Sequence, residues 1–85
     1  MKWYVYIVKC KDGSLYTGIT TDIDRRVKEH NTNNNLGAKS LRHKRPVRMV
    51  YCESHISQSD ARKREAAIKS WKREYKLKLI ERQTK

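Results

Sequence analysis

Residues 4–30 read YVYIVKCKDGSLYTGITTDIDRRVKEH, which predicts a β-hairpin that runs directly into a helix. Almost every residue from Trp3 to Val8 is β-branched or aromatic, and Leu15 to Thr20 is similar. Such side chains favour strands. Between them, Asp12-Gly13 is a strong hairpin signal. We therefore expect two antiparallel strands joined by a tight turn at the start of the chain.

The length of the hairpin loop decides which side chains share a face of the sheet. A two-residue loop at Asp12-Gly13 would pair Tyr6 with Ile19. A loop of three residues, the last of them glycine in the left-handed conformation, would pair Tyr6 with Gly18. Because side chains alternate between faces, only the longer loop puts Tyr6 and Tyr16 on one face. We expect this second register, in which Gly18 leaves room beside the Tyr6 ring.

The helix after the hairpin is marked by its capping residues. Thr21 is the expected N-cap, with Asp24 three residues later supplying an acid to the first turn. Arg26 and His30 are four residues apart and therefore share one face of this helix. An arginine beside the tyrosine face is what phosphate chemistry requires.

The second half of the chain predicts one strand and two helices. Residues 47–52 are expected to form the third strand, and residues 57–69 a helix capped by Ser57. From Ser70 onward, apolar residues recur at helical spacing and predict a last helix, although the alternation there leaves a strand as a competitor. The expected fold is α/β of the α+β kind: a small three-stranded antiparallel sheet with flanking helices, in the order β-β-α-β-α-α, forming one domain over residues 1–85.

One carboxylate of the second half is expected to point inward. Ala61, Glu65 and Ile68 are spaced four and three residues apart, so Glu65 shares a helix face with two apolar side chains. An inward carboxylate is usually paired or bound to a metal, because burying it bare costs too much free energy. The residues alone leave both alternatives open: a metal ligand, or a salt bridge with Arg26 or another nearby base.

The charge favours a polyanionic partner. Lysine and arginine number 21 against nine acids, a formal net charge of +12, which suits nucleic acid better than a membrane. Residues 39–48 hold five bases and no acid, and form either a phosphate-binding flank, with Arg42 the residue expected to reach inward, or a solvated basic loop. The candidate nucleic-acid-binding residues are Lys39, Arg42, Lys44, Arg45, Lys69 and Lys72.

The sequence indicates a cytoplasmic protein. The chain goes straight into a strand without a signal peptide, and no apolar run approaches the ~20 residues of a membrane span. Cys10 and Cys52 are then expected to be reduced and half-buried. Trp3 and Trp71 are expected in the core rather than as base-stacking platforms.

The chain resembles the GIY-YIG endonuclease superfamily over nearly its whole length. The two motifs that name the family appear as Tyr4-Val5-Tyr6 and Tyr16-Thr17-Gly18. The family's arginine falls on Arg26, its frequent histidine on His30, and its metal-binding glutamate on Glu65. The likeness is strongest to small stand-alone members and to related nuclease subunits that cut branched DNA.

The chain departs from the family pattern at three points. Tyr4 stands where the first motif has glycine, and Thr17 where the second has isoleucine or valine. Many members carry an asparagine near the end of the domain, but no asparagine follows Glu65 here.

The resemblance implies a metal-dependent endonuclease that hydrolyses DNA phosphodiester bonds and selects DNA structure rather than sequence. Tyr6 would accept a proton from the attacking water, and the positive field of Arg26 would bring its pKa toward neutrality. Tyr16 would position water or phosphate, and Glu65 would bind Mg²⁺ or Mn²⁺. His30 would orient a tyrosine or exchange protons, or else serve only as a packing residue.

Two other functions fit the same sequence. One is a DNA-binding module of the same fold with weak or no catalysis, which the departures from the motifs favour. The other is a basic scaffold that acts in DNA repair through a protein partner. Neither requires a metal on Glu65.

Overall fold

Three strands form one antiparallel sheet in the computed structural model, which describes residues 1–83. The central strand is β1 (Trp3–Lys9), with β2 (Leu15–Thr20) on one side and β3 (Arg48–His55) on the other. The order of the elements confirms the expected α+β fold, with the 3-10 helix η1 (Lys39–Lys44) added before β3.

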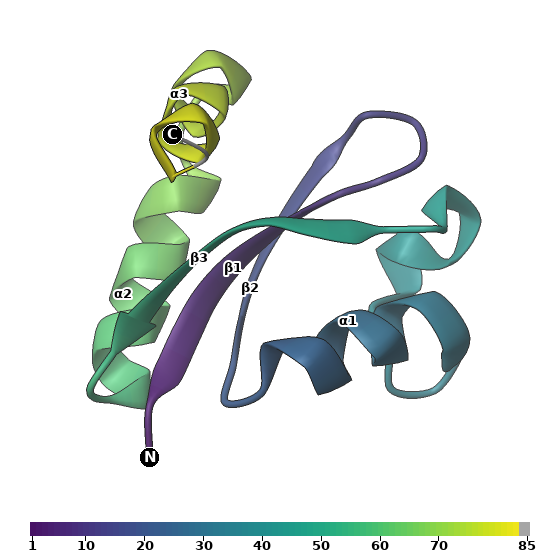
Figure 1. The fold of residues 1–85 in the computed structure, drawn as a ribbon, viewed down its shortest axis with the longest axis horizontal. Coiled ribbons are helices and arrows are strands. Elements are labelled where there is room, and N and C mark those ends of the chain that lie inside the picture. Colours follow the sequence, from purple (N-terminus) through teal and green to yellow (C-terminus); the bar gives the residue numbers. More distant parts are fainter. Residues whose placement is uncertain (84–85) are drawn as a thin grey trace.

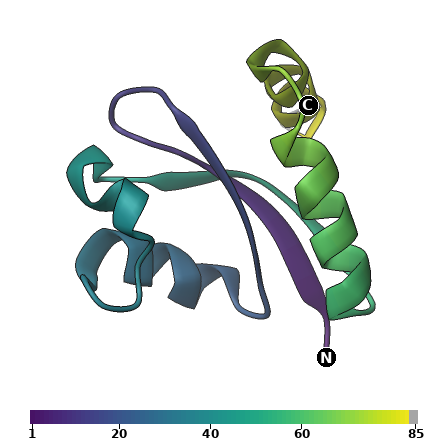
Figure 2. The ribbon, with the colours of Figure 1, turned by 180° about the vertical axis from the view of Figure 1, so that it is seen from behind.

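The helices lie on both faces of the sheet (Figure 1). The helix α1 (Ile23–Thr32) and η1 lie to one side, whereas α2 (Gln58–Lys69) and α3 (Arg73–Gln83) lie to the other. Figure 2 shows the same division from behind, with α1 and η1 together and α2 leading into α3. Two layers of side chains therefore meet the sheet, one on each face.

The hairpin has the register expected from a three-residue loop. Tyr6 pairs with Gly18 and Val8 with Tyr16, and Gly13 has a φ of 87°, in the left-handed region. Tyr6 and Tyr16 consequently lie on the same face, 6.5 Å apart between ring centroids. This register brings the two motif tyrosines together.

Strand alternation divides the core into two clusters. The cluster beneath α2 and α3 comprises the buried residues Val5, Ile7, Tyr51, Ala61 and Ile68. The cluster beneath α1 and η1 comprises Tyr6, Val8, Cys10, Leu41 and Val47. Trp3 and Trp71 pack against the first cluster but are only partly buried, so neither lies fully in the core.

Two details differ from the sequence-based expectations, and one open alternative is resolved. The N-cap of α1 is Asp22 rather than Thr21, because the Asp22 carboxylate accepts the Arg25 backbone N–H at 3.1 Å. The third strand extends to His55, beyond the expected end at residue 52. After Ser70, residues Arg73–Gln83 form the expected last helix, which removes the strand alternative for them.

The expected cap of the second helix is present, and the expectation about the cysteines is met in part. The Ser57 hydroxyl caps α2 by accepting the Asp60 backbone N–H. Cys10 and Cys52 are free thiols, although Cys10 is buried rather than half-buried. Within residues 1–83, no helix is both long enough and apolar enough to span a membrane.

Gly18 is the position at which the hairpin tolerates no side chain. A Cβ there would lie 2.6 Å from the Tyr6 Oη and 2.8 Å from its Cζ. We expect Gly18→Ala to displace the Tyr6 ring and to cost about 1–3 kcal/mol in urea unfolding. Gly13→Ala is the control for the ring position: its methyl group meets no atom within 4 Å and should leave the Tyr6 ring where it is, while its positive φ makes this substitution destabilising for a different reason. An unmoved Tyr6 NMR resonance in Gly18→Ala would contradict this prediction.

Thr17 offers a second test of the packing. Its side chain is 4 % exposed, and its hydroxyl has no hydrogen-bond partner within the described residues. A buried hydroxyl without a partner costs free energy that a methyl group does not. We therefore expect Thr17→Val to raise the free energy of unfolding by about 1 kcal/mol. Equilibrium unfolding in urea measures this, and a loss of stability would mean that the hydroxyl is bonded in solution.

Candidate active site

A hydrogen bond between Tyr6 and His30 joins the central strand to α1. The Tyr6 Oη lies 2.8 Å from His30 Nε2, and both residues are almost completely buried. Tyr6 comes from β1, and His30 comes from the last turn of α1. The helix and the strand thus hold the two side chains in fixed relation before any ligand binds.

The other nitrogen of His30 fixes the direction of this hydrogen bond. The Ala38 backbone N–H donates to His30 Nδ1 at 3.1 Å, so Nδ1 carries no proton. Burial and the nearby Arg26 lower the pKa of His30 to about 4, so the ring is neutral near pH 7. Its one proton therefore resides on Nε2 and is donated to the Tyr6 oxygen. The Tyr6 oxygen is an acceptor here, which leaves its own O–H proton available to another group.

Tyr16 completes a cluster of three rings. Its centroid lies 5.4 Å from the His30 ring in an edge-on arrangement, and 6.5 Å from the Tyr6 ring. Unlike the other two rings, Tyr16 is half-exposed. The cluster thus presents one accessible hydroxyl beside a buried pair.

Arg26 lies beside this cluster and is held by its own helix and the loop after it. Its Nη1 donates to Glu29 Oε1 at 3.0 Å and to the Leu36 carbonyl at 2.6 Å. Its guanidinium charge and a side-chain hydrogen bond act to lower the pKa of Tyr6. Burial acts to lower the pKa of Arg26 itself, but Glu29 and then Tyr6 outweigh it and raise that pKa. An anchored cation therefore faces the Tyr6 hydroxyl.

The expectation that this field brings the pKa of Tyr6 toward neutrality is wrong for the protein alone. Burial raises the pKa of Tyr6 to about 12, and Tyr16 adds to the rise, whereas Arg26 opposes it only in part. Desolvation disfavours the phenolate more than one guanidinium stabilises it. Tyr6 is consequently a neutral phenol at physiological pH.

Glu65 approaches the site from α2, on the other side of the sheet. Ala61 and Ile68 on the same helix face are fully buried, and the Glu65 side chain is 21 % exposed, so the expected inward facing holds. Its ion-pair partner is Lys69, at 3.4 Å, and not Arg26. Its charge also raises the pKa of Tyr6, so the carboxylate is within electrostatic reach of the phenol.

A metal ion at this site would depend on few protein ligands. The described residues contain no group of three or more His, Cys, Asp or Glu side chains placed to hold one. Glu65 is a half-buried carboxylate whose ion-pair partner within residues 1–83 is the exposed Lys69. A single carboxylate fits Mg²⁺ or Mn²⁺ when water and substrate phosphate supply the remaining oxygens.

The basic residues of segment 39–48 partly serve to hold the loop after α1 in place. Arg45 donates to the His30 carbonyl at 2.6 Å and also to Asn33 and Asn34, while Arg42 donates to the Asn34 carbonyl. Both arginines thus hold the loop after α1, and Arg42 turns to that loop instead of reaching inward. Lys39, Lys69 and Lys72 are exposed, and Lys44 is half-buried.

A family model described as the GIY-YIG catalytic domain matches residues 2–78. The chain belongs to the GIY-YIG family. This is a family of nucleases, and the side chains described above are the ones that the sequence resemblance assigned to its pattern. A further cluster, which no sequence motif marked, surrounds Glu53 of β3. The Glu53 carboxylate accepts hydrogen bonds from Tyr51 and Arg64, and it lies 2.6 Å from His55 Nε2.

Relatives of this GIY-YIG chain are small proteins of nearly the same length. A UPF0213 protein of Staphylococcus saprophyticus is 54 % identical over 79 residues, which cover 93 % of this chain and 94 % of that protein. The solution structure of a UPF0213 protein from Bacillus halodurans is 43 % identical, with a TM-score of 0.60, covering 95 % of this chain and 84 % of that one. A solution structure from E. faecalis is 37 % identical, with a TM-score of 0.65 and the same coverages.

The protonation of His30 is directly measurable. We expect its ring to stay neutral, with the proton on Nε2, as the pH falls from 6.5, and to become charged only near pH 4. Because the unfolded chain binds this proton near 6.5 and the folded chain near 4, stability is complete above 6.5 and falls on acidification, by up to about 3 kcal/mol. Long-range ¹H–¹⁵N NMR reports the tautomer, and a His30 titration near pH 6.5 would contradict the assignment.

Proposed function

We propose that this GIY-YIG protein is a metal-dependent endonuclease that hydrolyses DNA phosphodiester bonds. The observation that carries the proposal is the convergence of the Tyr6–His30 pair, Tyr16 and Arg26 on one face, with the Glu65 carboxylate in electrostatic reach of Tyr6. A phenol, an anchored cation and a carboxylate are the groups that phosphodiester hydrolysis needs: a proton acceptor, a stabiliser of negative charge and a metal ligand.

Tyr6 is the proton acceptor of the proposed reaction. His30 donates to its oxygen, so when Tyr6 loses its proton the phenolate keeps that hydrogen bond and gains the attraction of Arg26. The pKa of about 12 keeps Tyr6 neutral until further positive charge enters the site. Substrate binding with a divalent cation at Glu65 would supply that charge and would also remove the carboxylate's unfavourable effect on the phenolate.

Arg26 and Tyr16 act on the phosphate. The Arg26 guanidinium is held by Glu29 and the Leu36 carbonyl, so little reorganisation is needed before it donates to non-bridging oxygens as their charge grows. The half-exposed Tyr16 hydroxyl positions the phosphate or the attacking water. Glu65 would hold Mg²⁺ or Mn²⁺, which supplies Lewis-acid stabilisation of the leaving oxygen.

Binding that does not depend on DNA sequence is expected from the charge. A net charge of +12 on 85 residues binds phosphates without reading bases. The exposed Lys39 and Lys72 would contact the backbone outside the reaction centre. Binding through phosphates suits branched or single-stranded DNA. The proposed location of the protein is the cytoplasm, where it would reach such DNA.

A DNA-binding module with weak catalysis is the second candidate, and the raised pKa of Tyr6 favours it. A phenol with a pKa of about 12 is a poor proton acceptor near neutrality, and no asparagine follows Glu65 as in many family members. Such a module could act in repair through a protein partner. Binding without cleavage would distinguish it from the nuclease.

Two substitutions separate the nuclease from the binding module. We expect Tyr6→Phe and Glu65→Gln each to lower cleavage of labelled single-stranded, duplex and branched DNA by about 100-fold or more in Mg²⁺ or Mn²⁺. DNA affinity should stay the same or rise slightly in Glu65→Gln, because the substitution removes a negative charge. Gel-based cleavage and fluorescence anisotropy measure the two quantities.

The matched control is Glu74→Gln, which removes an exposed carboxylate from α3 and should leave cleavage intact. Wild-type cleavage should stop in the presence of a chelator. Tight binding with no cleavage of any of the three substrates would reject the nuclease in favour of the binding module. Joint loss of folding and binding in Glu65→Gln would mean that Glu65 is structural.

A further inference from the structure

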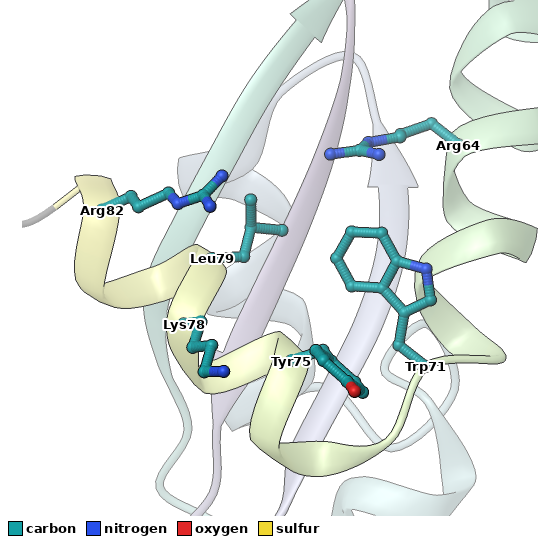
Figure 3. A pocket seen from close by; sticks show the side chains of 6 residues that line it. All are labelled: Arg64, Trp71, Tyr75, Lys78, Leu79 and Arg82. Atoms are coloured by element: carbon teal, nitrogen blue, oxygen red, sulfur yellow. The ribbon is translucent and has the colours of Figure 1, made fainter.

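A cavity of about 540 Å³ lies between the end of α2 and α3, lined by side chains from both helices and the turn between them. Its lining residues are Arg64, Trp71, Tyr75, Lys78, Leu79 and Arg82. Figure 3 shows the guanidinium groups of Arg64 and Arg82 extending toward one another from different helices, with Trp71 and Leu79 beside them. The volume lies within the range of small-ligand pockets.

The cavity combines aromatic rings with positive charge. Tyr75 is 51 % exposed, and Lys78 Nζ lies 5.5 Å from its ring centroid. The Arg64 guanidinium lies 5.2 Å from the centroid of Trp71. No acid lines the cavity, and of its three cations only Arg64 has an ion pair within residues 1–83, with Glu53 at 3.1 Å.

The ion pair between Arg64 and Glu53 holds one wall of the cavity in place. Glu53 also accepts the Tyr51 hydroxyl at 2.6 Å and lies 2.6 Å from His55 Nε2, so its carboxylate is held on several sides. Arg64 is therefore anchored over Trp71 instead of moving freely in solvent. Arg82, by contrast, is exposed. Of the three cations, Arg64 is therefore held in place, whereas Lys78 and Arg82 are exposed.

We propose that this cavity binds an unpaired nucleotide, with its base stacked on Tyr75 and the exposed part of Trp71 and its phosphate held by Arg64, Lys78 and Arg82. Aromatic rings beside cations are the recurring means of binding single-stranded nucleic acid, because every base has a face to stack. The bases of a continuous duplex are already stacked on one another. The cavity thus selects DNA that has a single-stranded segment.

The proposal rests on the proposed function, because it treats the nucleotide as part of the same DNA. Arg64 immediately precedes Glu65 on α2, so one helix contributes to the candidate active site and to the cavity. The longest extent of the molecule is 30 Å, which roughly nine nucleotides span at about 3.4 Å each. Another copy of this chain is a poor occupant, because two bodies of charge +12 repel each other.

Tryptophan fluorescence tests for stacking in the cavity. The chain has two tryptophans, so Trp3→Phe leaves Trp71 as the only reporter. We expect an oligothymidylate of about ten nucleotides to quench it, and an abasic strand of equal length and charge not to. Equal quenching by both strands would reduce the effect to charge and overturn the proposal.

Substitutions in the cavity test its contribution to binding. Tyr75→Ala should weaken oligothymidylate binding between about 5-fold and 150-fold, whereas Tyr75→Phe should retain it. Arg82→Gln should weaken binding more than Arg73→Gln, which removes an equal charge from α3 outside the cavity. Circular dichroism confirms that each variant is folded.

The outcomes separate the cavity from the nuclease. If wild type cuts DNA while Tyr75→Ala and Arg82→Gln bind like Arg73→Gln, the cavity proposal fails and the nuclease stands. If wild type neither binds nor cuts DNA, both fail. Displacement of the oligothymidylate from Trp71 by polyglutamate at equal charge concentration would assign the cavity to an acidic protein partner and overturn the proposal.

Discussion

The arrangement of the candidate site depends on the hydrogen bond from His30 to Tyr6. It crosses from α1 to the central strand in a buried layer, where an unpaired phenol or imidazole would cost substantial free energy. The bond forms only because Gly18 leaves space for the Tyr6 ring and because the Ala38 N–H fixes the tautomer of His30. A turn, a strand glycine and a loop amide thus together determine where the Tyr6 oxygen lies and which hydrogen bond it accepts.

The sequence predicted the parts of this arrangement that depend on periodicity. The position of Gly13 and the need for both tyrosines on one face were enough to choose the register, because a slip of one residue reverses every facing. The spacing of Arg26 and His30 predicted that they share one helix face. The spacing of Glu65 relative to Ala61 and Ile68 predicted that its side chain faces inward. These predictions need only the repeat of a strand or a helix.

The features that the sequence did not predict depend on three-dimensional surroundings. Thr21 and Asp22 are both competent N-caps, and the path of the chain chose Asp22. Arg42 was expected to reach inward, but the loop after α1 presents carbonyl groups that take up its donors and those of Arg45. The direction of the Tyr6 pKa shift follows from how completely the ring is buried, which composition does not reveal. The cavity beside Trp71 likewise arises only when α3 folds back along the sheet.

Burial of Tyr6 and its proposed role in catalysis are connected rather than opposed. A pKa of about 12 means that roughly one molecule in 100,000 carries the phenolate at pH 7, so in the protein alone the proposed proton acceptor is almost entirely protonated. Each additional positive charge near the buried oxygen acts through a low dielectric and therefore shifts this equilibrium more than it would in water. For the proposed function of a small protein with a net charge of +12, this dependence has a consequence. Electrostatic contact alone would not suffice for cleavage, because the phosphate and the cation must also reach the buried Tyr6–His30 pair together.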